Sequence, residues 1–162
     1  MIPNRLSFGC GCLAFLLTTG CGGDWYRASG KRLPDAAQMS AVARAVEQYA
    51  EVYPELASAA RAVHVWVADD IVFVKPPLLG HHGGLFDGYR TVIIVPQYFG
   101  AYLPWLLAHE LGHKLGGQRT TEPQADGVAD EFKRRWDARH PEAPILRLPN
   151  AYTPYTHAIS RR

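Results

Sequence analysis

Apolar residues recur every three or four positions in three long stretches of the chain, and this spacing predicts a helix in each. The first helix begins at Pro34-Asp35 and runs to about residue 52, and the Ala-rich residues 55–62 extend or follow it. The second includes Leu103 to Leu115 and ends at Gly116-Gly117, and the third runs from 122 to about 139. The positions expected to face the core are Met39, Val42, Val46, Tyr49, Leu103, Leu106, Leu107, Leu111, Leu115, Val128, Phe132 and Trp136.

Shorter apolar runs between the first two helices predict strands. Residues 63–68 alternate, with three valines on one side and His64 and Trp66 on the other. Residues 71–74 and 89–95 form two further apolar runs, each followed closely by proline. The pattern predicts an α+β domain with an N-terminal helix, a small three-stranded sheet and two C-terminal helices. After Pro141 the chain is proline-rich and is expected to be an irregular tail that packs against the domain.

Glycine-rich residues 79–88 are expected to form a mobile loop that rims a cleft. This loop contains His81-His82, but adjacent residues in extended chain point to opposite sides and rarely bind one metal ion. His64 is interpreted as an ordinary residue on a sheet face. Neither position is expected to carry chemistry.

The predicted helix over 103–116 contains His109-Glu110-Leu111-Gly112-His113. Residues four apart on a helix lie one above the other, so both imidazoles project toward a common point. Two neutral imidazoles in this arrangement suit a tetrahedral Zn²⁺, and Glu110 is close enough to act on a metal-bound water. Gly112 has no side chain, which leaves room for a neighbouring strand, and Gly116-Gly117 suit the end of the helix. The buried apolar face around the motif favours metal binding over a chance match.

A catalytic zinc site needs a third protein ligand, and the sequence offers several. The extended motif of the metzincins would place a histidine three residues after Gly116, but that position holds Arg119, which cannot bind a cation. A more distant histidine, His140 or His157, is one remaining source.

The other source lies at the start of the last helix, where Thr121 and Gln124 have the spacing of a capping box. Glu122 and Asp126 are four residues apart and share a face of that helix. Glu122 could coordinate the metal while Asp126 accepts a hydrogen bond from a ligating imidazole and fixes its tautomer. Alternatively, Asp126 could itself be the ligand. As ordinary residues, Glu122 would favour the helix N-terminus and Asp126 would belong to a solvated row with Asp130.

With these residues the chain resembles the gluzincin class of metallopeptidases, and in its short connection the compact ImmA/IrrE-like group. The resemblance covers about residues 90–136. It implies a minimal zincin-like fold in which one zinc ion is held by His109, His113 and Glu122. Glu110 would be the general base, and Asp126 would lie behind the ligands.

The same resemblance implies two further features of a peptidase. The strand beside the active helix, here residues 89–95, would be an edge strand that pairs with an extended peptide substrate. A tyrosine or histidine downstream of the third ligand would stabilise the oxyanion, and Tyr152, Tyr155 and His157 are the candidates.

The first 23 residues resemble a bacterial lipoprotein leader. Arg5 is their only charge, and residues 6–17 form an apolar run that is short for a membrane span, which needs about 20 residues. Gly20 precedes Cys21, although Thr18 stands where leucine is usual. These features predict a signal peptide over 1–20, lipidation of Cys21, a tether over 21–33 and a catalytic domain over 34–162. The protein is therefore expected to be exported and membrane-anchored, on the periplasmic or cell-surface side.

Composition adds two constraints. Past residue 23 the chain has 16 basic and 15 acidic residues, so no nucleic-acid partner is expected. All three cysteines lie within residues 10–21, which leaves the expected catalytic domain without a cysteine that could form stray disulfides in an oxidising compartment.

The function expected from the sequence is zinc-dependent hydrolysis of peptide bonds in a peptide or protein substrate. Two alternatives stay open. One is a lipid-anchored binding module with a structural zinc ion, and the other is a metal-dependent amidase that acts on cell-wall peptide.

Overall fold

The computed structural model describes residues 26–74, 80–86, 91–116 and 120–149. These residues form an α+β fold, as the sequence predicts. Its helices are α1 (Ala36–Val52), α2 (Ala57–Arg61), α3 (Leu103–Gly116) and α4 (Glu122–Arg139), with 3₁₀ turns at Pro54–Leu56 and Pro96–Tyr98. Its strands are β1 (Tyr26–Ser29), β2 (His64–Val67), β3 (Asp70–Phe73), β4 (Gly80–His81), β5 (Gly84–Phe86) and β6 (Thr91–Ile94). Among the described residues, none of the helices combines the length and the hydrophobicity that a membrane span requires.

Local capping explains where the two long outer helices begin. Oδ1 of Asp35 accepts the backbone N–H of Gln38 at 2.8 Å, and the Gln38 side chain accepts the N–H of Asp35 at 2.9 Å. At the start of α4, the Gln124 side chain accepts the backbone N–H of Thr121 at 2.8 Å. Both capping pairs are local in sequence, and α1 and α4 begin at the residues that these pairs predict.

Two positions expected to face the core do not. Met39 is 52% exposed because it lies in the first turns of α1, beyond the packed part of the helix. Leu115 is 41% exposed at the C-terminal end of α3. Val128 is half-buried.

The strands form two three-stranded sheets rather than the one predicted. One sheet has the order β1-β3-β4, and the other has the order β2-β6-β5, with β2 and β6 parallel and β5 antiparallel to β6. Strands β4 and β5 lie in the segment predicted to be a loop. Strand β1 lies in the segment predicted to be a tether, and its pairing with β3 makes residues 26–29 part of the fold.

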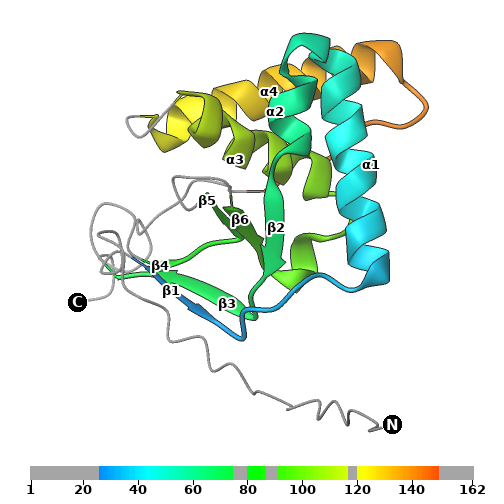
Figure 1. Ribbon diagram of the computed structural model, residues 1–162. Coiled ribbons are helices and arrows are strands. Elements are labelled where there is room, and N and C mark those ends of the chain that lie inside the picture. The colour runs from blue at the N-terminus through cyan, green and yellow to red at the C-terminus, as the bar shows by residue number, and fades with distance from the viewer. Residues whose placement is uncertain (1–25, 75–79, 87–90, 117–119, 150–162) are drawn as a thin grey trace, which may run out of the picture.

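Figure 1 shows the helices on one side of the strands, with β2, β6 and β5 between them and the sheet of β1, β3 and β4. The side chains of β6 agree with this arrangement. Val92 and Ile94 belong to the main core with the helices, whereas Ile93 packs in a second cluster with Ile71 and Phe73 of β3. Strand β6 is therefore buried on both faces, which explains its unbroken apolar sequence.

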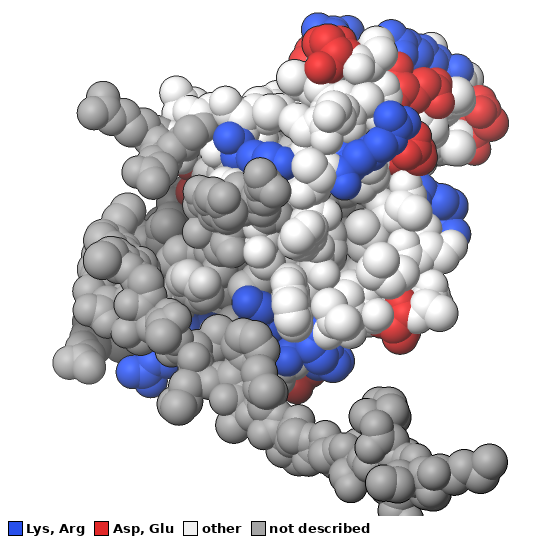
Figure 2. All heavy atoms as spheres, in the orientation of Figure 1, with Lys and Arg blue, Asp and Glu red and all other residues white. Residues whose placement is uncertain are grey.

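On the face drawn in Figure 2, charged side chains of both signs gather at the upper right, where Figure 1 shows the upper ends of α1, α2 and α4. Ion pairs in these elements join Glu47 to Arg61 and Glu131 to Arg134 and Arg135. Opposite charges therefore offset one another in this region.

Candidate metal centre

Helix α3 carries the two histidines and the glutamate of the motif into the core. His109 is 6% exposed and Glu110 is 3% exposed, and they are the only buried polar or charged residues in the part of the chain that the structure describes. Leu106, Leu107 and Leu111 are buried around them. Burying an ionisable side chain costs free energy unless it has partners, so the partners of these two residues define the site.

Three ligand-type atoms converge at one point. Nε2 of His113 lies 3.2 Å from Nε2 of His109, and the Glu122 carboxylate lies 3.1 Å from Nε2 of His109 and 3.4 Å from Nε2 of His113. All three residues offer a ligand atom within 4.8 Å of the others. His109, His113 and Glu122 could therefore hold a metal ion.

Close packing of α3 against α4 brings Glu122 to the histidines. A Cβ added at Gly112 would lie 3.1 Å from Cα of Ala125 and 3.2 Å from Cβ of Val128. The missing side chain thus lets helix α4 approach, rather than the neighbouring strand that the sequence analysis expected. The two helices meet at Gly112, one residue from His113.

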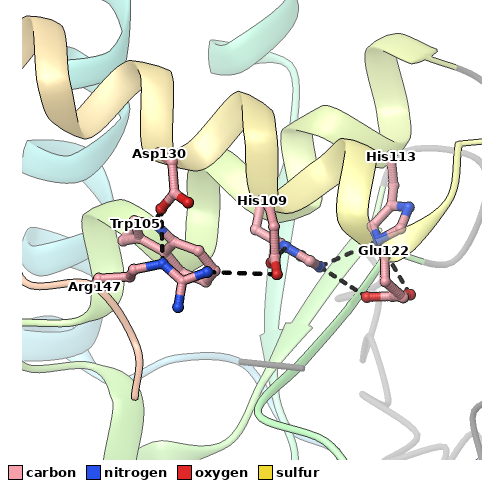
Figure 3. Close-up of polar contacts among 7 residues, drawn as sticks. Trp105, His109, His113, Glu122, Asp130 and Arg147 are labelled. Atoms are coloured by element: carbon pink, nitrogen blue, oxygen red, sulfur yellow. Dashed lines mark hydrogen bonds and ion pairs between the residues drawn. The ribbon is translucent and has the colours of Figure 1, made fainter. Parts of the chain in front are cut away.

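Figure 3 shows a second layer of polar contacts behind His109. The Nδ1–H of His109 donates to Oδ1 of Asp126 at 2.8 Å, which leaves Nε2 directed toward Glu122 and His113. The indole ring of Trp105 stacks on the His109 ring with centroids 5.6 Å apart. Asp126 therefore supports the His109 ring from behind, and Glu122 rather than Asp126 belongs to the group that could hold a metal ion.

Glu110 faces strand β5. Its carboxylate accepts the backbone N–H of Phe86, and a Cβ added at Gly84 would lie 2.5 Å from its Oε1. The expectation that residues 89–95 form the edge strand is wrong, because β6 lies between β2 and β5. Strand β5 is the edge strand beside the helix. The sequence did not predict β5, because a segment of three residues that begins with glycine has almost no strand-like pattern.

The charges of the site shift the pKa values of its members. Burial raises the pKa of Glu110 to about 7, against the lowering effect of the two histidines. Burial alone would lower the pKa of His109, but its hydrogen bonds to Asp126 and Glu122 raise it to about 10. Burial would raise the pKa of Glu122, but hydrogen bonds from His109 and His113 lower it to about 2. These shifts favour a charged His109 paired with a charged Glu122.

Other residues considered from the sequence lie apart from this group. His140 caps the far end of α4, where its Nε2 contacts the Glu51 carboxylate at 2.7 Å, so it is not a third ligand. His82 packs on Phe73 with ring centroids 4.4 Å apart, and His64 is exposed on β2. Cys21, Arg119, Tyr152, Tyr155 and His157 lie outside the described residues.

Sequence reasoning missed Asp130, Trp105 and Arg147. Oδ1 of Asp130 accepts the indole N–H of Trp105 at 2.8 Å and the Nε–H of Arg147 at 2.9 Å. A signal was present for Asp130, since Glu122, Asp126 and Asp130 form one row along α4, but the row also fitted a solvated helix face. Arg147 gave no signal, because its segment has no periodicity.

Comparisons of the chain with protein-family models, with curated proteins and with solved structures found no match.

Proposed function

We propose that this protein is a zinc-dependent peptidase. The observation that carries the proposal is the convergence of His109, His113 and Glu122 beside the buried carboxyl group of Glu110. Two imidazoles and one carboxylate are a donor set that zinc takes in hydrolytic enzymes, with the fourth position left to water. A zinc ion held there would supply a water of lowered pKa and polarise a carbonyl group.

The chain's own residues have distinct tasks in this proposal. Glu110 takes a proton from the attacking water and delivers it to the leaving amine. Burial raises the pKa of Glu110, which favours a carboxylate that readily takes up a proton. Asp126 holds the His109 ring with Nε2 toward the ligand position.

Strand β5 supports a peptide substrate rather than a small amide. It is the edge of its sheet among the described strands and lies against α3 beside Glu110, which accepts the Phe86 N–H. An extended peptide could pair with other backbone groups of that edge. Such pairing would hold the scissile bond near Glu110.

A structural zinc ion fits the site less well. Structural zinc sites usually close with four protein ligands, whereas the group found among the described residues has three. The buried Glu110 next to the group has no role in a purely structural site.

We also propose that the protein is exported and anchored through a lipid on Cys21, as its leader indicates. In a bacterial host, labelling with a palmitate analogue should mark the wild-type protein and not Cys21→Ser. Equal labelling of the two proteins would refute lipidation at this residue.

The proposed activity is tested with purified protein and an unstructured protein substrate. We expect about one zinc per chain by elemental analysis, cleavage of the substrate, and loss of cleavage with a chelator. Glu110→Gln should abolish cleavage while the zinc content stays near one, because Glu110 is not in the ligand group.

Glu142→Gln is the matched control, since Glu142 is an exposed glutamate in the segment after α4. It should cleave as the wild type does. Cleavage by Glu110→Gln, or a metal other than zinc in the active protein, would overturn the proposal. Digestion of purified peptidoglycan without cleavage of the protein substrate would identify the cell-wall amidase instead.

A further inference from the structure

One side chain outside the ligand group contacts both residues that support His109. Arg147 lies in the segment after α4, and its Nη2 is 3.7 Å from Oδ2 of Asp126. Its guanidinium carbon lies 5.2 Å from the centroid of the Trp105 ring. Asp126 bonds the His109 ring at its edge, and Trp105 stacks on its face. The Arg147 guanidinium is thus linked to His109 by two routes, one through Asp126 and one through Trp105 (Figure 3).

The segment that carries Arg147 is anchored to the core. Ile145 and Leu148 are buried in the main hydrophobic cluster. The backbone N–H of Ile145 donates to Oδ1 of Asp137 at 2.8 Å, and the Trp136 indole donates to the carbonyl of Ala143 at 2.9 Å. Arg147 therefore extends from a backbone that Ile145 and Leu148 hold against the core on either side of it.

The contacts also form one connected set. Asp130 accepts hydrogen bonds from both Arg147 and Trp105, so it ties the guanidinium to the indole. The single positive charge of Arg147 faces two carboxylates on successive turns of α4, Asp126 and Asp130. Without that charge the two carboxylates would repel each other, and nothing else described in this set would hold Asp126 from the side opposite His109.

We propose that Arg147 is a positioning residue of the metal site, which fixes Asp126 and Trp105 against His109 and so raises the affinity for the metal that it does not touch. This inference rests on the proposed metal site. It assigns to the segment after α4 a part in building that site. Residues that orient a ligating histidine typically change metal affinity 10- to 100-fold when they are removed. Because Arg147 acts through such residues and is 43% exposed, we expect the lower end of that range.

The test compares Arg147→Gln with Arg135→Gln. Arg135 is a close structural match, since it is 44% exposed, its Nε donates to Glu131 at 2.7 Å, and its guanidinium lies 5.1 Å from the Tyr53 ring. It contacts none of the site residues named here. Zinc affinity is measured by competition with a chromophoric chelator. We expect Arg147→Gln to weaken binding about tenfold and Arg135→Gln to leave it within twofold of wild type.

A double-mutant comparison shows whether Arg147 acts through Asp126. In the Asp126→Asn background, Arg147→Gln should weaken zinc binding by a much smaller factor than in the wild type. An undiminished factor in that background, or equal affinities of Arg147→Gln and the wild type, would overturn the inference. If the wild-type protein itself binds no zinc, the proposed metal site fails, and the role assigned to Arg147 fails with it.

Discussion

Gly84→Ala should disable the proposed catalytic glutamate while leaving the metal ligands in place. The φ angle of Gly84 lies outside the left-handed region, so alanine fits the backbone. Its methyl group would nevertheless lie 2.5 Å from Oε1 of Glu110 and 3.1 Å from a methyl group of Leu106. Because an ordinary contact begins at 3.4 Å, the carboxyl group must move by about 0.9 Å or strand β5 must withdraw from α3.

The size of this displacement sets the expected effect. A shift of about 1 Å in a group that acts on the reacting atoms costs about 100-fold in rate, which corresponds to about 2.7 kcal/mol of transition-state stabilisation. The Glu110 carboxyl group would also lose its hydrogen bond from the N–H of Phe86 if the strand withdrew. We therefore expect kcat/KM to fall about 100-fold.

The assay is cleavage of an unstructured protein, measured together with zinc content and thermal unfolding. Gly100→Ala is the matched control, because a Cβ at Gly100 meets nothing within 4 Å and its φ is also outside the left-handed region. It should keep the activity of the wild type. Gly84→Ala with normal kcat/KM and normal zinc content would refute the close approach of β5 to Glu110, or the role of Glu110.

Three further predictions concern charge and protonation. Burial, with smaller contributions from Tyr53 and Glu55, raises the pKa of Tyr49 to about 12, so the contribution of Tyr49 to stability should fall by about 2 kcal/mol as the pH rises from 10 to 12. Denaturant unfolding across this range tests it, and Tyr49→Phe should remove that fall. Zinc binding at pH 7 should release at least one proton, because the pKa of His109 in the metal-free protein is about 10. Zinc affinity should therefore rise with pH below the pKa of His109. Calorimetry in buffers of different ionisation enthalpy measures the proton release, and identical binding heats in those buffers would contradict it. Asp126→Asn should weaken zinc binding about 10- to 100-fold, since the amide accepts less strongly from the imidazole, and unchanged affinity would exclude Asp126 as a support of His109.

The helices could be predicted from the sequence because their signals are local. The capping residues Asp35 and Thr121 each find a partner three residues later, and the helices begin where those pairs stand. The proximity of His109 and His113 could also be predicted, because residues four apart on one helix bring their rings together. The position of Glu122 depends in addition on how α4 packs against α3. Glu122 was predicted as the third ligand, with Asp126 or a distant histidine as the alternatives.

The small strands could not be predicted in the same way. Strands β4 and β5 have two and three residues and begin at glycine, so they carry almost no strand pattern of their own. Their place depends on pairing with β3 and β6, which do carry an apolar pattern. Strand β1 has polar residues at alternate positions and gains its place only by pairing with β3. Nor does the sequence show that Gly112 faces a helix, since its contact with Ala125 depends on how α4 folds back.

Anomalous diffraction at the zinc absorption edge, from crystals of protein purified without added metal, tests the central proposal most directly. We predict one strong peak bounded by Nε2 of His109, Nε2 of His113 and the Glu122 carboxylate, at about 2.0–2.2 Å from each. We also predict that Asp126 stays hydrogen-bonded to Nδ1 of His109 and does not touch the ion. A peak at another place, an ion coordinated by Asp126 instead of Glu122, or no peak at these three residues would contradict the proposed zinc site.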